Sequence, residues 1–426
     1  MNEANQQPTA SEAPGLRELF KIRDFRALWG GQVVSDFGDG MTSLALLLLV
    51  NKLTGSTTAL ATMAIMLAIP QLTFGLAAGV YVDRLDRKKI MIFSDLLRGI
   101  FVLGFLLVDS PDKLWILYTI GFIQSTIGTF FNPARGALLP NIVPKESLLA
   151  ANSIAQTSMI IFRLVGTGAA GGLIGFFEGY WEIFIIDAIT FFVSLMLISR
   201  IRYIAPQSQH DSEINFRTVV EELAGGLSVT FSNRILTGSI AALSVTMLGL
   251  GAVNILLVPL LVNDLQIKET WFVVLELAQT SSMILSSGLV AVLAARFRST
   301  NILSAGLIGL GAGVAALALP SNVWHVVVIL FAVGWFITPV QAAVQTIIQT
   351  AVPDELRGRT GAANNAMITT ANLVSMAMAG MLGDTIGVRN VFVVGGGLVA
   401  LAGVLSGVIF RGVEAQVDGE PVQGAF

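Results

Sequence analysis

The chain contains no cysteine, so disulfides, iron–sulfur clusters and thiol-based catalysis are excluded at once. Charged residues are also scarce, at 12% of the chain, whereas soluble domains carry about 25%. Apolar residues make up 54% of the chain, and its mean hydropathy is +0.76. A composition with so little charge is not that of a soluble domain, and we predict a protein that crosses a membrane several times.

Sequence motifs of several enzyme classes are missing as well. No G-x-x-x-x-G-K-[ST] loop and no H-E-x-x-H helix occurs, which argues against ATP hydrolysis and zinc-dependent proteolysis. Residues 1–13 are polar and lack the apolar core of a signal peptide, so the first membrane helix is expected to direct insertion. We therefore expect no enzymatic activity, no metal site and no cofactor.

Long apolar runs alternate with glycine, proline and charged residues along the chain. A helix needs about 20 apolar residues to cross the hydrocarbon core, and the chain accommodates about twelve such runs. We predict an all-α membrane protein with twelve transmembrane helices in two six-helix bundles. The predicted helices span residues 26–50, 57–82, 89–108, 114–132, 150–176, 180–199, 236–262, 270–295, 300–319, 323–350, 359–384 and 389–410.

The distribution of lysine and arginine predicts the orientation of these helices. If the N-terminus is cytoplasmic, Arg98 and Arg163 fall within spans and most other basic residues fall in cytoplasmic segments. Because basic loops favour the cytoplasmic side, we predict a multi-pass protein of the cell (inner or plasma) membrane with both termini in the cytoplasm. The basic residues on the opposite side are Lys52, Lys113, Lys268 and Arg389.

The longest polar interruption lies midway and divides the chain into two halves. An x-x-Pro turn precedes the fifth helix, at Pro133, and the eleventh, at Pro339, as expected for transporters built from two related halves. The interruption itself contains apolar residues at helical spacing, which predict a short helix on the inner membrane surface, either a plain linker or a regulatory element. Those residues are Phe216, Val219, Val220, Leu223 and Leu227. The predicted segments are an N-terminal tail (1–25), an N-terminal half (26–199), a linker (200–235), a C-terminal half (236–411) and a C-terminal tail (412–426).

The charged segment 79–91 resembles the signature loop of the major facilitator superfamily, G-x-L-a-D-r-x-G-r-k-x-x-l. The matching positions are Gly79, Asp83, Arg84, Arg87 and Lys88. Tyr81 and Asp86 depart from the pattern. With Asp86 in that place, the loop resembles that of the branch that contains macrolide efflux proteins and the enterobactin exporter. The resemblance covers the chain apart from its tails. It implies the major facilitator fold and alternating access, and it says little about the substrate.

In this superfamily the signature loop belongs to a charge network that locks one conformation. The resemblance therefore implies a gating set in this chain, in which Asp83 meets a helix end of the other half in one state only. The alternative is that the basic residues only fix the topology. The gating set consists of Gly79, Asp83, Arg84, Asp86, Arg87, Lys88, Asp95 and Arg98.

Ionised side chains inside a membrane span are costly and usually face a partner or a wet cavity. Asp36 and Asp39 lie one turn apart in the first helix, and Arg163 lies at a similar depth in the fifth. We predict that one of the two carboxylates alternates between a proton and either Arg163 or a cationic substrate, because burial favours the protonated form and a nearby arginine the ionised form. The alternative is a permanent ion pair that fixes helix packing. The superfamily's usual arginine in helix four falls on Gln124, which the resemblance places in the same cavity.

The candidate cavity residues of the second half are Glu276, Gln279 and Trp335. Glu276 with Gln279 either binds substrate or reaches the outer headgroup region. Trp335 either stacks on an aromatic or cationic molecule or packs in the core. Asp187 in the sixth helix is expected to make a structural hydrogen bond.

Together these features predict a secondary active transporter that exports small amphipathic molecules, of a drug-like or macrolide-like kind, with the proton gradient as its energy source. Two central acids against one arginine favour a neutral or cationic substrate. Alternatives within transport are export of a siderophore or another metabolite and a facilitator without proton coupling; an intramembrane enzyme and a passive channel or sensor are the other classes. The expected partners are a small-molecule substrate and the lipid bilayer, with no nucleic acid, and we expect a monomer.

Overall fold

The computed structural model describes residues 16–177, 179–202, 225, 227–228, 230–232, 234–352 and 357–417. Within these ranges the chain is helical and contains no strand. The N-terminal half comprises α1 (Leu16–Leu19), α2 (Arg23–Thr54), α3 (Thr57–Arg84), α4 (Arg87–Val102), α5 (Leu114–Ile142), α6 (Leu148–Phe177) and α7 (Trp181–Ser199). The C-terminal half comprises α9 (Arg234–Pro259), α10 (Phe272–Arg296), α11 (Ser299–Ala316), α12 (Val323–Ala351), α13 (Arg357–Ile386) and α14 (Val388–Val417).

Twelve of the helices in the described ranges are long and apolar enough to cross a membrane. The predicted all-α fold with twelve spans is therefore confirmed. Two of the spans are completed by short non-α turns, because α4 continues as a 3-10 helix over Leu103–Leu107 and α9 as a π-helix over Leu260–Asp264. Of the linker helix predicted over residues 216–227, residues 216–224 and 226 lie outside the described residues, as do residues 1–15 and 418–426 of the tails.

The fourth membrane helix is longer than the sequence predicted. We placed its end near residue 132, ahead of Pro133, but α5 continues to Ile142 and contains both Pro133 and Pro140. Proline is tolerated in membrane helices because neighbouring helices, Ser/Thr side chains and local backbone adjustments satisfy the carbonyl that proline leaves free. The consequence is that Arg135 belongs to a membrane helix and not to a loop.

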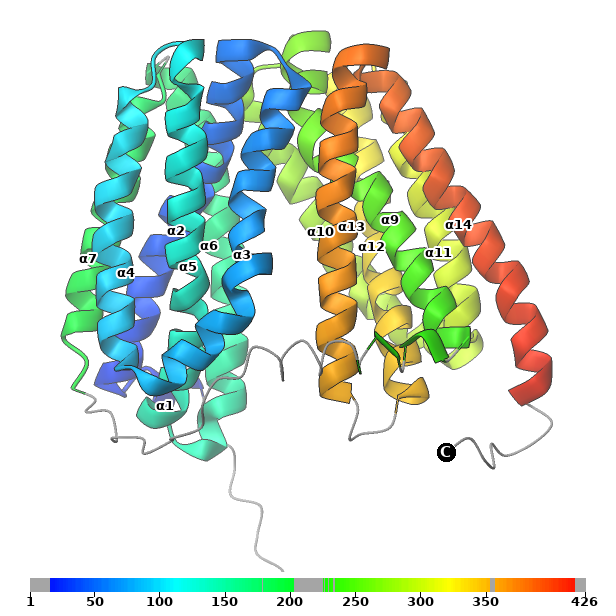
Figure 1. Ribbon diagram of the computed structural model, residues 1–426, viewed down its shortest axis with the longest axis horizontal. Coiled ribbons are helices and arrows are strands. Elements are labelled where there is room, and N and C mark those ends of the chain that lie inside the picture. Colours follow the sequence, from blue (N-terminus) through cyan, green and yellow to red (C-terminus); the bar gives the residue numbers. More distant parts are fainter. Residues whose placement is uncertain are drawn as a thin grey trace, which may run out of the picture.

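The helices form two bundles that converge at one end and separate toward the other (Figure 1). Within the first bundle α2 packs on α6 and α7, and within the second α11 packs on α14 and α13 on α9. We call the end that holds the α3–α4 turn, at Leu85 and Asp86, the basic end. The opposite end, which holds the α2–α3 turn at Gly55 and the α13–α14 turn at Gly387, is the closed end.

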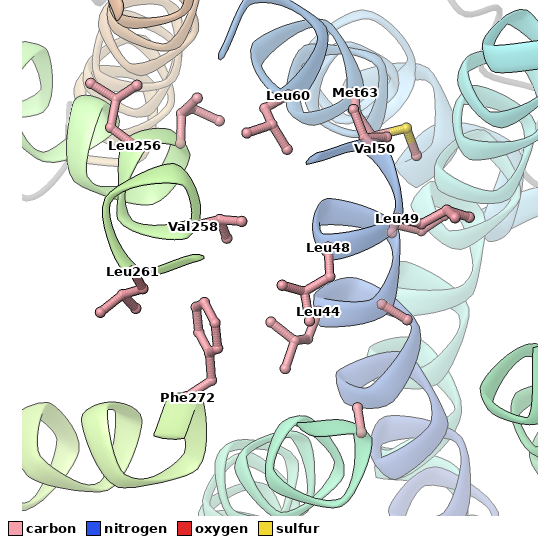
Figure 2. Packing of buried hydrophobic residues seen from close by; sticks show 14 of the residues in the cluster. Leu44, Leu48, Leu49, Val50, Leu60, Met63, Leu256, Val258, Leu261 and Phe272 are labelled. Atoms are coloured by element: carbon pink, nitrogen blue, oxygen red, sulfur yellow. The ribbon is translucent and has the colours of Figure 1, made fainter. Parts of the chain in front are cut away.

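An apolar cluster shared by both bundles joins them at the closed end. Leu44 and Leu48 of α2 share this cluster with Leu256 of α9, Leu261 of the π-helix that follows it and Phe272 of α10 (Figure 2). All five side chains are at most 6% exposed. Since lipid tails are as apolar as leucine, packing complementarity holds such a cluster together in a membrane.

Glycines bring α2 and α6 into close contact in the middle of the first bundle. A Cβ atom built at Gly166 would overlap the Phe37 carbonyl oxygen, and one built at Gly40 would overlap the Arg163 backbone. Small residues at such a crossing let two helix backbones approach closely. The crossing places the polar residues of α2 directly opposite Arg163.

Candidate functional site

A cavity of about 400 Å³ lies inside the N-terminal bundle, and we call it the N-half cavity. Side chains of α2 to α7 surround it, so that residues far apart in the sequence face the same space. Its polar lining consists of Gln32, Ser35, Asp36, Asp39, Thr42, Ser43, Gln71, Arg98, Gln124, Ser125, Thr129, Asn132, Arg135, Arg163, Thr167 and Asp187.

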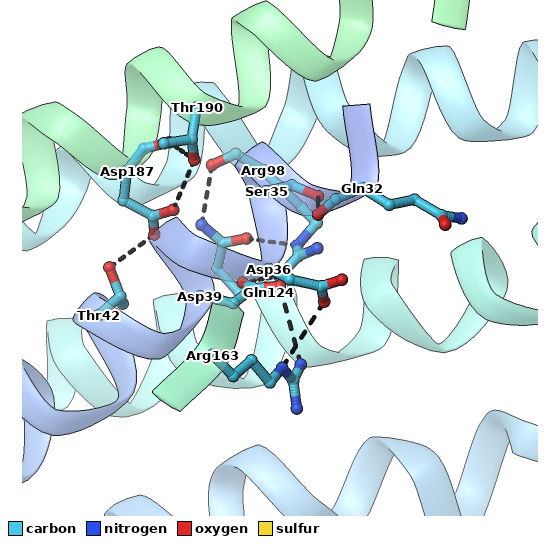
Figure 3. Close-up of polar contacts among 10 residues, drawn as sticks. All are labelled: Gln32, Ser35, Asp36, Asp39, Thr42, Arg98, Gln124, Arg163, Asp187 and Thr190. Carbon is cyan, nitrogen blue, oxygen red and sulfur yellow. Dashed lines mark hydrogen bonds and ion pairs between the residues drawn. The ribbon is translucent and has the colours of Figure 1, made fainter. Parts of the chain in front are cut away.

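Two carboxylates of α2 share this cavity with Arg163 (Figure 3). Arg163 Nε lies 3.7 Å from Asp36 Oδ1, and its Nη2 lies 3.8 Å from Asp39 Oδ2. The structure thus contains the ion pair that the sequence placed here. Both distances exceed hydrogen-bond length. The side chain of Arg163 is 54% exposed, against 13% for Asp36 and 18% for Asp39, so the arginine is held loosely.

Arg98 binds Asp39 much more tightly than Arg163 does. Its Nη2 donates to Asp39 Oδ1 over 2.5 Å, and its guanidinium lies 4.2 Å from the centre of the Phe191 ring. The sequence assigned Arg98 to the gating set, and the structure corrects this assignment. Arg98 lies eleven residues into α4, or about 16 Å from the basic end, which is too deep for a loop contact.

Gln124 holds Arg98 from the other side. The Gln124 Nε2 donates to the Arg98 carbonyl over 2.8 Å, and Arg98 Nε donates to Gln124 Oε1 over 3.4 Å. Gln124 therefore lies in the cavity lining, where the family resemblance placed it, and it positions the arginine supplied by the neighbouring helix.

Two further acids lie beside this cluster. Asp187 accepts hydrogen bonds from Thr42 over 2.6 Å and from Thr190 over 3.1 Å, as the sequence led us to expect. Asp95, which the sequence placed in the gating set, is fully buried in the middle of α4 beside Ser194 and does not reach the basic loop. The physical reason is helical rise, because eight residues separate it from the start of α4, which is about 12 Å.

The described side chains of the signature loop bind their own half. Asp86 caps α4 by accepting hydrogen bonds from the amides of Lys88 and Lys89 over 3.0 and 3.2 Å. Arg87 donates to the Ala137 carbonyl over 3.0 Å, and Lys88 donates to the Ile201 carbonyl over 2.6 Å. The backbone of α3 includes Gly79, Asp83 and Arg84. The surroundings of their side chains lie outside the described part of the structure.

A helix cap between the halves is present at the closed end instead. Asp384 of α13 accepts hydrogen bonds from Ser56 Oγ, the Thr57 amide and the Thr58 amide over 2.7, 2.8 and 3.1 Å, at the first turn of α3. The side-chain amides of Asn51 and Asn263 form two reciprocal hydrogen bonds, 2.9 and 3.1 Å long, between α2 and the π-helix that follows α9. Sequence reasoning missed this cap; the Ser-Thr-Thr run at the start of α3 was the available signal.

The candidate residues of the C-terminal half are not part of the lining of the N-half cavity. Glu276 is exposed on α10 and has no hydrogen-bond or ion-pair partner among the described residues. Gln279 uses its backbone carbonyl to accept from Ser282. Trp335 stacks on Phe331, with ring centres 6.4 Å apart and planes inclined by 24°. This contact corresponds to the packing alternative for Trp335.

An amide-lined cavity of about 570 Å³ lies between α9, α12 and α13. Among the described residues its lining contains no charged side chain; besides apolar residues it has Gln341, Gln345, Gln349, Asn364 and Asn365. Sequence reasoning missed this C-half cavity. The signal was present as glutamines at every fourth position from Gln341, which share one face of a helix.

The charge balance of the N-half cavity differs from the sequence prediction. Three arginines, at positions 98, 135 and 163, face three aspartates, at positions 36, 39 and 187. The prediction counted two acids against one arginine because it placed Arg98 in the gating set and Arg135 in a loop. The charge argument for a neutral or cationic substrate therefore fails. Within the described ranges, no group of three or more acidic or histidine side chains is arranged so that it could hold a metal ion.

Twelve membrane helices in two bundles correspond to the major facilitator fold. Residues 17–421 match the family model described as transmembrane secretion effector, and the chain belongs to this family. Its relatives include the uncharacterised MFS-type transporter YfiS of Bacillus subtilis, 27% identical over 89% of this chain and 91% of the relative. Macrolide efflux protein A of Streptococcus pyogenes is 24% identical over 88% and 93%. The putative bacilysin exporter BacE of Bacillus subtilis is 36% identical over 32% and 34%.

Solved structures of transporters share the fold. The nucleoside transporter NupG superposes with a TM-score of 0.73 at 11% identity and covers 91% of this chain and 99% of its own. A bacterial homologue of the human lysosomal transporter Spinster, solved in an inward-facing and unoccupied conformation, gives 0.70 at 12% identity over 93% and 98%. The predicted superfamily and fold are thereby confirmed.

Proposed function

We propose that this protein exports small amphipathic molecules across the cell membrane by proton-driven alternating access. The single observation that carries the proposal is the loosely held Arg163 between Asp36 and Asp39, in a cavity of a molecule whose opposite end is sealed between the halves. The efflux proteins among the relatives support the direction of transport. With basic loops on the cytoplasmic side, the basic end faces the cytoplasm and the structure is an inward-open state.

The exchange of partners within this cluster supplies the coupling. Among the described residues, Asp39 has a short hydrogen bond to Arg98, whereas Asp36 has only the long ion-pair contact to Arg163. When a substrate or the rocking of α6 withdraws Arg163, Asp36 is left buried without a counter-ion, and a proton from the outer side neutralises it. Release of that proton to the cytoplasm restores the pair with Arg163. Each cycle therefore moves a proton inward as the substrate moves outward.

The test measures uptake of a radiolabelled small amphipathic molecule, phenylalanyl-alanine, added outside everted membrane vesicles. We expect uptake that stops when an uncoupler collapses the proton gradient, and at least a tenfold loss of gradient-driven uptake in Asp36→Asn. Uptake by Asp36→Asn at the level of the native chain would contradict the coupling role. Uptake that is insensitive to the uncoupler would instead support the alternative of a facilitator without proton coupling.

A further inference from the structure

The basic side of the N-half cavity holds two hydrogen-bond donors with no acceptor. Arg135 lines the cavity and, among the described residues, makes no hydrogen bond or ion pair at contact distance. Gln32 is 5% exposed, and its buried Nε2 has no hydrogen-bond partner within the described structure. Leaving a buried donor unpaired destabilises the folded state, so native proteins rarely do so without a function.

The two donors are neighbours. Gln32 and Arg135 line the N-half cavity together, and they also share a smaller cavity of about 70 Å³ beside it. Both groups offer N–H donors toward the same space, and Arg135 adds a positive charge. A carboxylate satisfies such a pair, because it accepts from a guanidinium and an amide at the same time.

An acidic pole lies beside this donor pair. Asp36 lines the same cavity one helical turn after Gln32 on α2, and its charge acts on Arg135. Its contact to Arg163 is 3.7 Å long, and Arg163 is 54% exposed, so a substrate ammonium group can displace the arginine. The cavity thus presents a carboxylate next to an arginine and an amide.

We infer that the N-half cavity takes a zwitterion, whose carboxylate binds Arg135 and Gln32 and whose ammonium group binds Asp36. This inference rests on the proposed transport function and names the chemical class of its substrate. A singly charged molecule would satisfy only one of the two poles. Such a cavity therefore attracts a zwitterion and also disfavours singly charged molecules, which leave one pole without its ligand group.

The inference is tested by binding of three probes built on one scaffold to the purified full-length chain. The probes are the zwitterion phenylalanyl-alanine, its methyl ester, which keeps only the ammonium group, and its N-acetyl derivative, which keeps only the carboxylate. Since a hydrogen bond to a charged group contributes about 1.5 to 3 kcal/mol, we expect the native chain to bind the zwitterion about tenfold more tightly than either derivative.

Two variants assign the poles. Arg135→Gln is expected to abolish the advantage of the zwitterion over the methyl ester and to leave binding of the ester unchanged, which also shows that the variant is folded. Asp36→Asn is expected to abolish its advantage over the N-acetyl derivative. Arg26→Gln is the matched control, because Arg26 is exposed near the start of α2 and lines no cavity.

Equal affinities for the three probes, absence of binding by all of them, or unchanged binding of the zwitterion by Arg135→Gln would overturn the inference. A failure of the transport proposal is distinguishable, because binding is measured without a membrane or a gradient. If the chain binds the zwitterion with this charge dependence but shows no uncoupler-sensitive transport, the inferred binding site stands and the proposed function is contradicted.

Discussion

At the scale of single residues, the two carboxylates of α2 have different surroundings despite their proximity. Asp39 makes a 2.5 Å hydrogen bond to Arg98, whose backbone Gln124 holds in turn. Asp36 has only the longer contact to the half-exposed Arg163. The sequence offered the ion pair as either a proton switch or a packing element. The geometry suits Asp39 to the packing role and Asp36 to the switch.

This difference predicts unequal losses of stability. Asp39→Asn leaves the buried Arg98 without its counter-ion, and we expect a destabilisation of about 2 to 4 kcal/mol, seen as a lower Tm in detergent. Asp36→Asn is the matched control, and it should cost less than about 1 kcal/mol because its partner is half exposed. Equal Tm values for the two variants would contradict the division of roles.

At the scale of elements, the crossing of α2 and α6 determines where the charged residues meet. Gly40 and Gly166 remove the side chains that would keep the two backbones apart, and Arg163 lies one turn before Gly166 on the same helix. If the helices crossed at a larger distance, Arg163 would not reach both carboxylates. The glycines therefore contribute to function by keeping α2 and α6 close enough for Arg163 to reach both carboxylates.

A pair of alanine substitutions on α6 tests this contribution. Gly166→Ala places a Cβ against the Phe37 carbonyl, and we expect a loss of about 1 to 3 kcal/mol in stability and weaker coupling between Arg163 and Asp36. Gly172→Ala is the control on the same helix, because its Cβ would meet nothing within 4 Å. Thermal unfolding of the two variants decides, and a Gly166→Ala variant as stable as Gly172→Ala would contradict the argument.

At the scale of the whole molecule, contacts between the halves gather at the closed end. The Asp384 cap on α3, the Asn51–Asn263 pair and the shared apolar cluster all lie there. The described side chains of the signature loop meet no residue of the C-terminal half. The sequence expected a helix cap between the halves at Asp83; in this state the structure has its counterpart at the other end of the same helix.

The closed-end cap predicts a shift between conformations. Asp384→Asn removes the charge that accepts hydrogen bonds from the first turn of α3, and we expect the closed end to open more often, by about tenfold, since each charge-assisted bond contributes about 1.5 to 3 kcal/mol. The chain has no cysteine, so Leu256→Cys, buried in the shared cluster, is a unique reporter of opening. Its labelling rate by a maleimide should rise in the Asp384→Asn background.

The control is Asp112→Asn, which removes an exposed acid from the α4–α5 connection without touching the other half. An unchanged labelling rate in Asp384→Asn, or an equal rise with Asp112→Asn, would show that the cap does not hold this end closed.

The sequence by itself determined the class of the molecule. Apolar runs of membrane length predict twelve helices whatever their packing, because backbone groups in lipid must be paired within each span. The signature loop identified the superfamily, and the depths of Asp36, Asp39 and Arg163 along their helices were enough to place them together.

Only the tertiary structure decided which charges share the cavity. Helical depth is readable from spacing, but the face that a helix turns inward depends on its neighbours, and apolar residues on every side of these helices hide that face. Arg98 was therefore assigned to the gating set, Arg135 was placed in a loop after a proline that does not end its helix, and the glutamines of α12, although they share one helix face, were not connected with a cavity. The pairing of Arg135 with Gln32, on which the substrate class depends, exists only because α2 and α5 meet in the folded bundle.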